Sequence, residues 1–281
     1  MEKLCDLHTH STFSDGTYTP KEIINKAVKL KLSAIALCDH NTVDGIPSFL
    51  SAAQDKPIEA VSGTEFSVDL DGKEIHMLSL FIPDNYLSQV SELMLDSNKR
   101  KEQSNIELIE ALRKNGYELN YEEIKSSTPM GKINRAHIGA ALTQKGYTKS
   151  VNEAFATLLS TNAGLYKAPK RTSVWEIIDF IRSIGAIPVL AHPFLNLNAD
   201  ELKNFLPLAK KRGLVGMECK YCLYDAETEK LAFNMADSFG LKYSGGSDFH
   251  GDIKPDIELG FGKGDLRVPY EWYLELKKQL K

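Results

Sequence analysis

Two histidines separated by one residue, His8 and His10, follow a short apolar run near the start of the chain. If that run is a β-strand, both side chains lie on one face of it. Two imidazoles directed at one point from a rigid element are typical metal ligands. Asp15 follows in a Ser-Asp-Gly turn that can bring its carboxylate back toward the same point. The stretch therefore predicts a metal site, and the alternative is a surface loop that happens to carry two histidines.

Further histidines and carboxylates stand at or near the ends of other predicted strands, or within one. These candidate ligands are His40, Glu65, His76, His192, Asp248 and His250. Together with the first three they make nine, which is too many for one metal ion and fits two or three divalent ions that share a carboxylate. Any one histidine of the seven could be an ordinary surface or core residue, but that explanation does not account for the set.

The elements that must position these ligands predict an α/β fold. Short apolar strands are expected over 3–7, 33–38, 58–65, 74–81, 186–191 and 216–219, and from 242. Amphipathic helices are expected over 22–30, 46–53, 173–183, 201–212, 225–239 and 270–280. This alternation indicates parallel strands, and reactive groups of such folds gather at the carboxyl ends of the strands.

Residues 85–165 interrupt that rhythm, because they are polar and mostly helical. We therefore divide the chain into a first barrel part (1–84), a helical insertion (85–165) and a second barrel part (166–281). Arg135 and His137 open one of the insertion helices, and a helix N-terminus is a favourable place for an anion. Arg100 and Lys101, on the long helix expected over 90–114, could reach a second phosphate, although a solvated helix face explains them equally well.

Composition narrows the possible partners. The 281 residues carry a net charge of -4, which argues against a broad basic face for duplex DNA. A phosphorylated small molecule or the end of a short RNA remains possible, since metal ions can supply local positive charge. No run approaches a membrane span, and the first motif leaves no room for a signal peptide, so a cytoplasmic protein is expected. Cys219 and Cys222 have the spacing of a redox or zinc pair, but buried free thiols are the simpler interpretation.

The stretches DLHTHSTFSDG, ALCDHNTVDG, GTEFS, EIHMLSL, VLAHP and GGSDFH resemble, in that order, the motifs of the PHP (polymerase and histidinol phosphatase) superfamily. The chain is most similar to the bacterial branch of 3',5'-nucleoside-bisphosphate phosphatases and 5'-to-3' exoribonucleases. That branch carries a helical insertion with an Arg-x-His motif, matched here by Arg135 and His137. The resemblance implies a distorted (β/α)7-type PHP barrel and a hydrolase of nucleotide phosphate esters that uses a metal-activated water and no protein nucleophile.

The resemblance also implies how the ligands divide among ions. One set is His8, His10, Glu65 and Asp248; a second is Glu65, His76 and His192; a third is Asp15, His40 and His250. The ions could be manganese, iron, zinc or magnesium, which nitrogen and oxygen ligands accept in part by availability. Phe194 stands where the family usually has glycine after His-Pro, and it could narrow the substrate side of the cleft.

Three rival functions remain open. An amidohydrolase also begins with His-x-His, but it usually bridges its metals with a carbamylated lysine, and Glu65 stands at that strand tip here. A histidinol-phosphate phosphatase shares the metal ligands but is disfavoured by the Arg-x-His insertion. A metal-binding protein without turnover is expected to lose the anion-binding pair, yet Arg135 and His137 are present.

Overall fold

A computed structural model of the protein describes residues 3–128 and 133–280, and its strands form a nearly closed barrel. The sheet has eight strands in the order β7-β6-β5-β4-β3-β2-β1-β8. Their bounds are β1 (Leu4–Thr9), β2 (Ala34–Leu37), β3 (Glu59–Leu70), β4 (Lys73–Leu80), β5 (Ile187–Leu190), β6 (Gly216–Tyr221), β7 (Lys242–Gly246) and β8 (Val268–Pro269). The predicted α/β barrel is confirmed.

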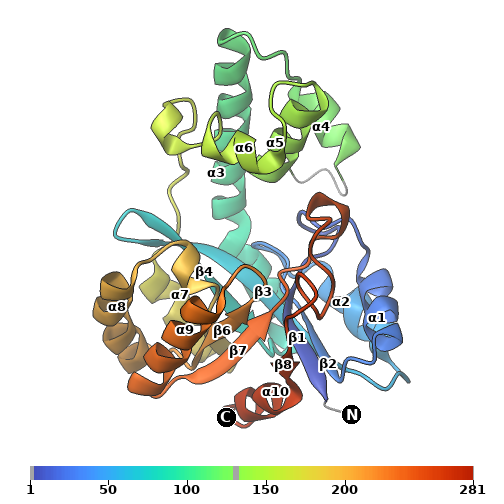
Figure 1. Ribbon diagram of the computed structural model, residues 1–281, viewed down its shortest axis with the longest axis vertical. Coiled ribbons are helices and arrows are strands. Elements are labelled where there is room, and N and C mark those ends of the chain that lie inside the picture. Colours follow the sequence, from blue (N-terminus) through green and yellow to red (C-terminus); the bar gives the residue numbers. More distant parts are fainter. Residues whose placement is uncertain (1–2, 129–132, 281) are drawn as a thin grey trace.

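Helices surround the barrel, and both chain ends lie near α10 (Figure 1). The surrounding helices are α1 (Pro20–Lys29), α2 (Ile46–Ala53), α7 (Val174–Ser183), α8 (Ala199–Arg212), α9 (Ala226–Ser238) and α10 (Tyr270–Lys277). The sequence determines where α1 begins, because Thr19 and Glu22 form a reciprocal capping box and Pro20 occupies the first turn. Apolar side chains of the strands are buried on both faces of the sheet, against the helices and inside the barrel.

Two strands depart from the expected parallel pairing: the short β8 runs antiparallel to β1, and β4 is reversed within the sheet. This strand runs antiparallel to both β3 and β5, whereas β1, β2 and β3 pair in parallel, as do β5, β6 and β7. The physical reason is the two-residue turn Asp71-Gly72, in which both residues have positive φ, as a tight hairpin requires. In addition, β3 does not end at Glu65 as predicted but continues to Leu70. Glu65 therefore projects from the middle of a long strand.

The helical insertion stands on one end of the barrel (Figure 1). It contains α3 (Leu87–Lys114), α4 (Tyr121–Ser127), α5 (Arg135–Gln144) and α6 (Val151–Ala156). The first turns of α3 pack into the main core through Val90 and Met94. The second half of α3 belongs to a separate apolar cluster with the other insertion helices. One long helix thus connects a small second core to the barrel.

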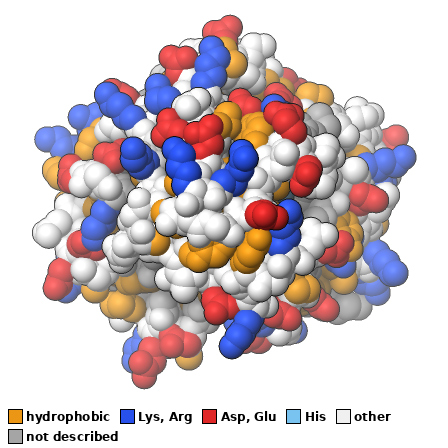
Figure 2. Space-filling view, turned by 90° about the horizontal axis from the view of Figure 1, so that it is seen from above, with side chains coloured by type: hydrophobic (Ala, Val, Ile, Leu, Met, Phe, Trp, Pro, Cys, Tyr) orange, Lys and Arg blue, Asp and Glu red, His pale blue; other side chains and the backbone are white. Residues whose placement is uncertain are grey.

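The surface of the molecule on the side of the helical insertion carries both positive and negative side chains. Seen from the insertion side, lysine and arginine side chains are interspersed with aspartate and glutamate (Figure 2). Among the described residues, this face shows no broad basic patch of the kind that binds duplex DNA. Among the described helices, none combines the length and the apolar character needed to cross a membrane.

Asp6, on β1, closes the barrel through buried hydrogen bonds. Its carboxylate accepts from the backbone nitrogens of Ser247 (2.9 Å) and Gly260 (2.8 Å) and from the Ser247 hydroxyl (2.5 Å). These bonds join the first strand to segments that follow it by more than 240 residues.

We expect Asp6→Ala to lower the free energy of unfolding by about 2–4 kcal/mol, because it leaves buried donors without an acceptor. Urea denaturation monitored by circular dichroism measures the change. Asp96→Ala, at an exposed position of α3, is the matched control and should change stability by no more than about 0.5 kcal/mol. Equal free energies of unfolding for the two variants would show that the Asp6 hydrogen bonds do not stabilise the closed barrel.

Candidate metal centre

The buried carboxylate of Glu65 is the centre of the site. Each of its oxygens faces imidazole nitrogens, at distances between 2.8 and 3.3 Å. The imidazoles belong to His8, His10, His40, His76 and His192. The hairpin contributes to this arrangement, because His76 on β4 is diagonal to Glu65 across the β3–β4 ladder.

Two further carboxylates flank this centre. Asp15 lies 3.3 Å from His250 Nε2 and 3.7 Å from His40 Nε2. Asp248 Oδ1 lies 3.1 Å from His10 Nε2 and 3.4 Å from His250 Nδ1. All nine residues that the sequence singled out as metal ligands therefore lie around one end of the barrel.

Within this constellation, three compact groups have ligand atoms within 4.8 Å of one another. The groups are His10, Asp15, His40 and His250; His8, His10 and Glu65; and His40, Glu65 and His76. Compared with the sets implied by the resemblance, His10 joins the Asp15 group, and His40 takes the place of His192 beside Glu65 and His76. His192 Nε2 nevertheless lies 2.9 Å from Glu65 Oε1.

The donor atoms fit divalent metal ions. Buried polar atoms normally have hydrogen-bond partners, yet several here have none among the described residues, including His10 Nδ1, Asp15 Oδ1 and His192 Nδ1. Imidazole nitrogen and carboxylate oxygen together suit manganese, iron or zinc. The histidine and carboxylate clusters can therefore hold metal ions.

Charge complementarity keeps the carboxylates ionised. Burial alone would raise the pKa of Glu65, but His76, His8 and His40 outweigh it and hold the pKa well below its usual range. Conversely, burial opposes the charged form of His76, but Glu65 and Glu74 raise its pKa to about 10. For His10, Asp248 and Glu65 likewise outweigh burial and raise the pKa to about 9.

Sequence reasoning missed Glu218, which positions two of the histidines. Its Oε1 lies 3.0 Å from His8 Nδ1, and its Oε2 accepts a 2.6 Å hydrogen bond from the backbone nitrogen of His192. His192 has a positive φ of 23°, a strained conformation of the kind that persists at functional sites when neighbours hold it. A glutamate within the apolar strand β6 was the signal that could have revealed this role.

Asp39 was also missed. It accepts hydrogen bonds from Ser11 N (2.7 Å), the Ser11 hydroxyl (2.6 Å) and the Ser14 hydroxyl (2.6 Å). These bonds fix the loop between His10 and Asp15 against the end of β2. The carboxylate next to His40 in the sequence thus orients a neighbouring loop.

Arg135 reaches the centre from the N-terminus of α5. Its guanidinium lies 3.1 Å from Glu74 Oε2 and stacks 4.3 Å from the centre of the Tyr166 ring. Arg171, which the sequence did not single out, lies 2.7 Å from the same Glu74 oxygen. His76, Arg171 and Arg135 overcome the effect of burial and keep the pKa of Glu74 below its usual range. Two arginines therefore converge beside the metal centre.

His137, in the first turn of α5, has a buried side chain and is not among the described residues that line the cleft. Burial lowers its pKa. Its Nδ1 accepts a hydrogen bond from Asn134 N (3.1 Å), so the proton of the neutral ring is on Nε2. The Asn134 side chain in turn donates a 2.5 Å hydrogen bond to Asp15 and links the insertion to the metal centre.

The cleft over the centre has a volume of about 390 Å³. Lys101 and Lys254 line it as cations, and Phe155, Leu195 and Leu223 provide an apolar wall. Arg100 is exposed and donates to the Lys170 carbonyl (2.9 Å), and it is absent from the described lining. Phe194 is also absent, because its ring packs against Tyr224 and the adjacent Leu195 lines the cleft instead.

Cys219 and Cys222 are buried free thiols, as the simpler interpretation predicted. Burial raises the pKa of Cys222 to about 12, and the pKa of Cys219 is also raised by burial. Neither thiol belongs to the compact ligand groups of the described chain.

A barrel that gathers histidines and carboxylates at one end, beside converging cations, defines a metal-dependent phosphoesterase. The chain belongs to the PHP domain family, whose model matches residues 6–167. The expected resemblance and the expected hydrolase class are both confirmed at this level.

Individual relatives cover almost the whole chain. A 5'-3' exoribonuclease from Haemophilus influenzae is 30% identical over 251 residues, 89% of this chain and 91% of its own. A 3',5'-nucleoside bisphosphate phosphatase from Chromobacterium violaceum is 26% identical, covering 91% of this chain and 90% of its own. A Bifidobacterium adolescentis crystal structure assigned as a metal-dependent phosphoesterase shares the fold at a TM-score of 0.86 and 24% identity, covering 99% and 97% of the two chains.

The raised histidine pKa values predict that metal binding releases protons. At pH 7.5 His10 and His76 are protonated in the metal-free protein, because their pKa values are about 9 and about 10. Ligation requires the neutral ring, so a metal must displace these protons and its affinity should rise as the pH increases toward 9.

Calorimetric titration of manganese into metal-free protein, in two buffers with different ionisation enthalpies, measures this release. The binding heat should differ between the buffers by an amount that corresponds to at least these two protons. A heat that is the same in both buffers would contradict the assignment.

Proposed function

We propose that this protein hydrolyses phosphate esters of nucleotides, namely 3',5'-nucleoside bisphosphates and the 5' ends of short RNA. The observation that carries the proposal is the Glu65 centre, with its five surrounding imidazoles, next to the cations Lys101, Arg135 and Lys254 of the cleft lining. Arginine forks bind phosphate oxygens in pairs, and an ordinary structural ion pair does not require three cations in one cleft. The names of both relatives agree with a phosphorylated nucleotide.

We assign two or three divalent ions to the centre. The nine proposed ligands are His8, His10, Asp15, His40, Glu65, His76, His192, Asp248 and His250. Glu65 would contribute to more than one of these ions, because imidazoles approach both of its oxygens. Bound divalent ions supply Lewis acidity toward the phosphoryl group and an activated water as nucleophile. Manganese, iron, zinc and magnesium are all compatible with the oxygen and nitrogen donors.

The chain's own side chains bind and orient the substrate. Arg135 is the proposed phosphate ligand, and Glu74 holds its guanidinium in place until an anion arrives. Lys254 Nζ and Tyr221 OH both donate to Asp248 Oδ2, at 2.7 and 2.8 Å, and so fix this carboxylate beside the histidines. We also propose His137, whose Nε2 has no hydrogen-bond partner among the described residues, and Arg100 as further phosphate donors.

A screen of phosphate release tests the function against its rivals. Manganese-loaded protein is assayed on a 3',5'-nucleoside bisphosphate, a 5'-mononucleotide, histidinol phosphate and a short 5'-phosphorylated RNA. We expect release from the bisphosphate, hydrolysis of the RNA, or both. Release from histidinol phosphate alone would overturn the assignment, and metal binding without release from any substrate would favour a non-catalytic metal-binding protein.

Arg135→Ala should raise the Michaelis constant for a nucleotide substrate about tenfold, because it removes a charge-assisted hydrogen bond to phosphate. Steady-state kinetics with the best substrate of the screen measure the effect. Arg113→Ala, at an exposed position of α3, is the matched control and should leave the constant unchanged. An unchanged value for Arg135→Ala would remove this residue from the phosphate site.

A further inference from the structure

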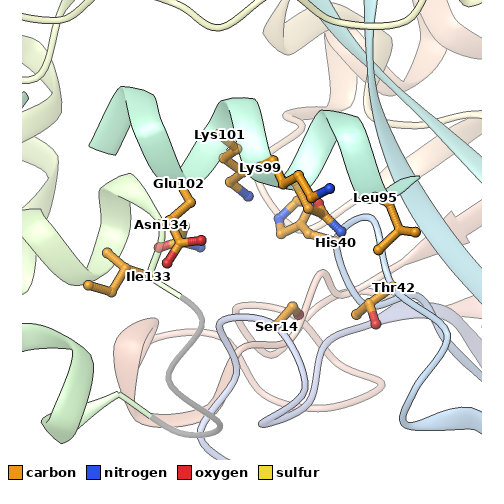
Figure 3. Close-up of a pocket in the computed structure, with 10 residues that line it drawn as sticks. Ser14, His40, Thr42, Leu95, Lys99, Lys101, Glu102, Ile133 and Asn134 are labelled. Carbon is orange, nitrogen blue, oxygen red and sulfur yellow. The ribbon is translucent and has the colours of Figure 1, made fainter. Parts of the chain in front are cut away.

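A second cavity of about 250 Å³ adjoins the metal centre on the side of α3. We call it the α3 chamber and define it by Leu95, Lys99 and Glu102 on α3 and by Ser14 and Thr42 opposite them. Figure 3 shows the α3 side chains directed toward the open space above Ser14. The side chain of Asn98 fixes the helix over this space by donating a 3.0 Å hydrogen bond to the Asn41 carbonyl.

The chamber and the cleft share one wall. His40, Lys101 and Asn134 line both cavities. His40 faces Glu65 and Asp15, and Asn134 donates to Asp15, so the shared wall is part of the metal centre. A phosphate bound at the centre is therefore flanked by two separate spaces. A phosphomonoester needs only one of them, whereas a phosphodiester has a substituent on each side.

The lining of the chamber suits a nucleotide. Lys99 is exposed and forms no ion pair within the described part of the chain, and Lys101 lies one residue further along the helix. Glu102 is acidic, but it is engaged by Tyr121 OH (2.7 Å) and Lys125 Nζ (3.2 Å). Leu95, with 54% of its surface exposed, and Ile133 offer apolar area for a base.

We infer that the α3 chamber holds the nucleotide on the 3' side of a scissile phosphodiester, while the cleft holds the 5'-terminal nucleotide. This inference rests on the proposed function and narrows it to a diesterase that accepts at least two linked nucleotides. The outer rim of the chamber is exposed at Leu95 and Lys99, so a longer chain can continue into solvent.

The reaction is a hydrolysis that needs only water as co-reactant. The water oxygen forms a bond to phosphorus, and the bond from phosphorus to the 3' oxygen of the 5'-terminal ribose breaks, so the phosphate stays on the shortened chain as its new 5' phosphate. One proton of the water ends on that ribose oxygen as a hydroxyl group. The 5'-terminal nucleotide leaves from the cleft, and the shortened chain leaves from the chamber.

Lys99→Glu tests the inference, with Lys114→Glu, at an exposed position of the same helix, as the matched control. Each protein is assayed with manganese on the dinucleotide pApA, by AMP release, and on adenosine 3',5'-bisphosphate, by phosphate release. For Lys99→Glu we expect kcat/KM to fall about tenfold or more on pApA, the size of one charge-assisted contact, and to change less than about twofold on the bisphosphate.

Two further measurements separate a lost contact from a folding defect. Leu95→Ser should lower kcat/KM on pApA and spare the bisphosphate, because it removes apolar area from the same chamber. For Lys99→Glu, the salt dependence of kcat/KM on pApA should also become shallower, by about 0.7 in the logarithmic slope.

Equal losses of Lys99→Glu on both substrates, or no loss on either, would overturn the inference. A wild-type protein that hydrolyses the bisphosphate but not pApA would overturn it as well and leave the proposed function standing. A wild-type protein that hydrolyses neither would refute both.

Discussion

A buried carboxylate is stable only when positive charge or strong hydrogen-bond donors compensate it, and Glu65 imposes this requirement on its whole surroundings. Its oxygens lie in the barrel end without solvent exposure, so imidazoles approach from β1, the β2 tip, β4 and the β5 tip. Without metal, His10 and His76, whose pKa values are raised to about 9 and about 10, compensate the charge as imidazolium. Bound divalent ions would take over that role, with the rings as neutral ligands. The need to compensate the Glu65 charge therefore explains both why histidines cluster around this carboxylate and why the cluster is suited to bind metal ions.

The backbone is arranged to meet this constraint. The β3–β4 hairpin lets β3 continue past the barrel end, so that Glu65 and His76 face the same space from neighbouring strands. Glu218 holds His8 and the strained backbone of His192 from below, in the manner of carboxylates that orient metal-bound histidines. From above, Asn134 connects the insertion to Asp15. The insertion thus places cations over a centre that the barrel alone supplies with anions and imidazoles.

The ligands could be predicted from sequence because each stands beside a short apolar run, and parallel strand ends converge. The antiparallel direction of β4 was harder to predict from the sequence. EIHMLSL has the apolar pattern of any buried strand, and only Asp71-Gly72 indicates that the chain reverses direction there. Glu218 and Arg171 were missed because their roles arise from contacts between distant segments. The insertion helices were found from periodicity. The α3 chamber could not be predicted from the sequence, because a cavity depends on how the helix is placed over the barrel.

We propose that the nine ligand residues would hold divalent ions around Glu65. Anomalous diffraction at the manganese edge, from crystals grown with manganese, tests it most directly. We expect at least two peaks, with both Glu65 oxygens at coordination distance, about 2.2 Å, and with Asp15 or Asp248 beside one of them. A single ion bound away from Glu65, or no peak among the histidines while the protein still hydrolyses phosphate esters, would contradict it.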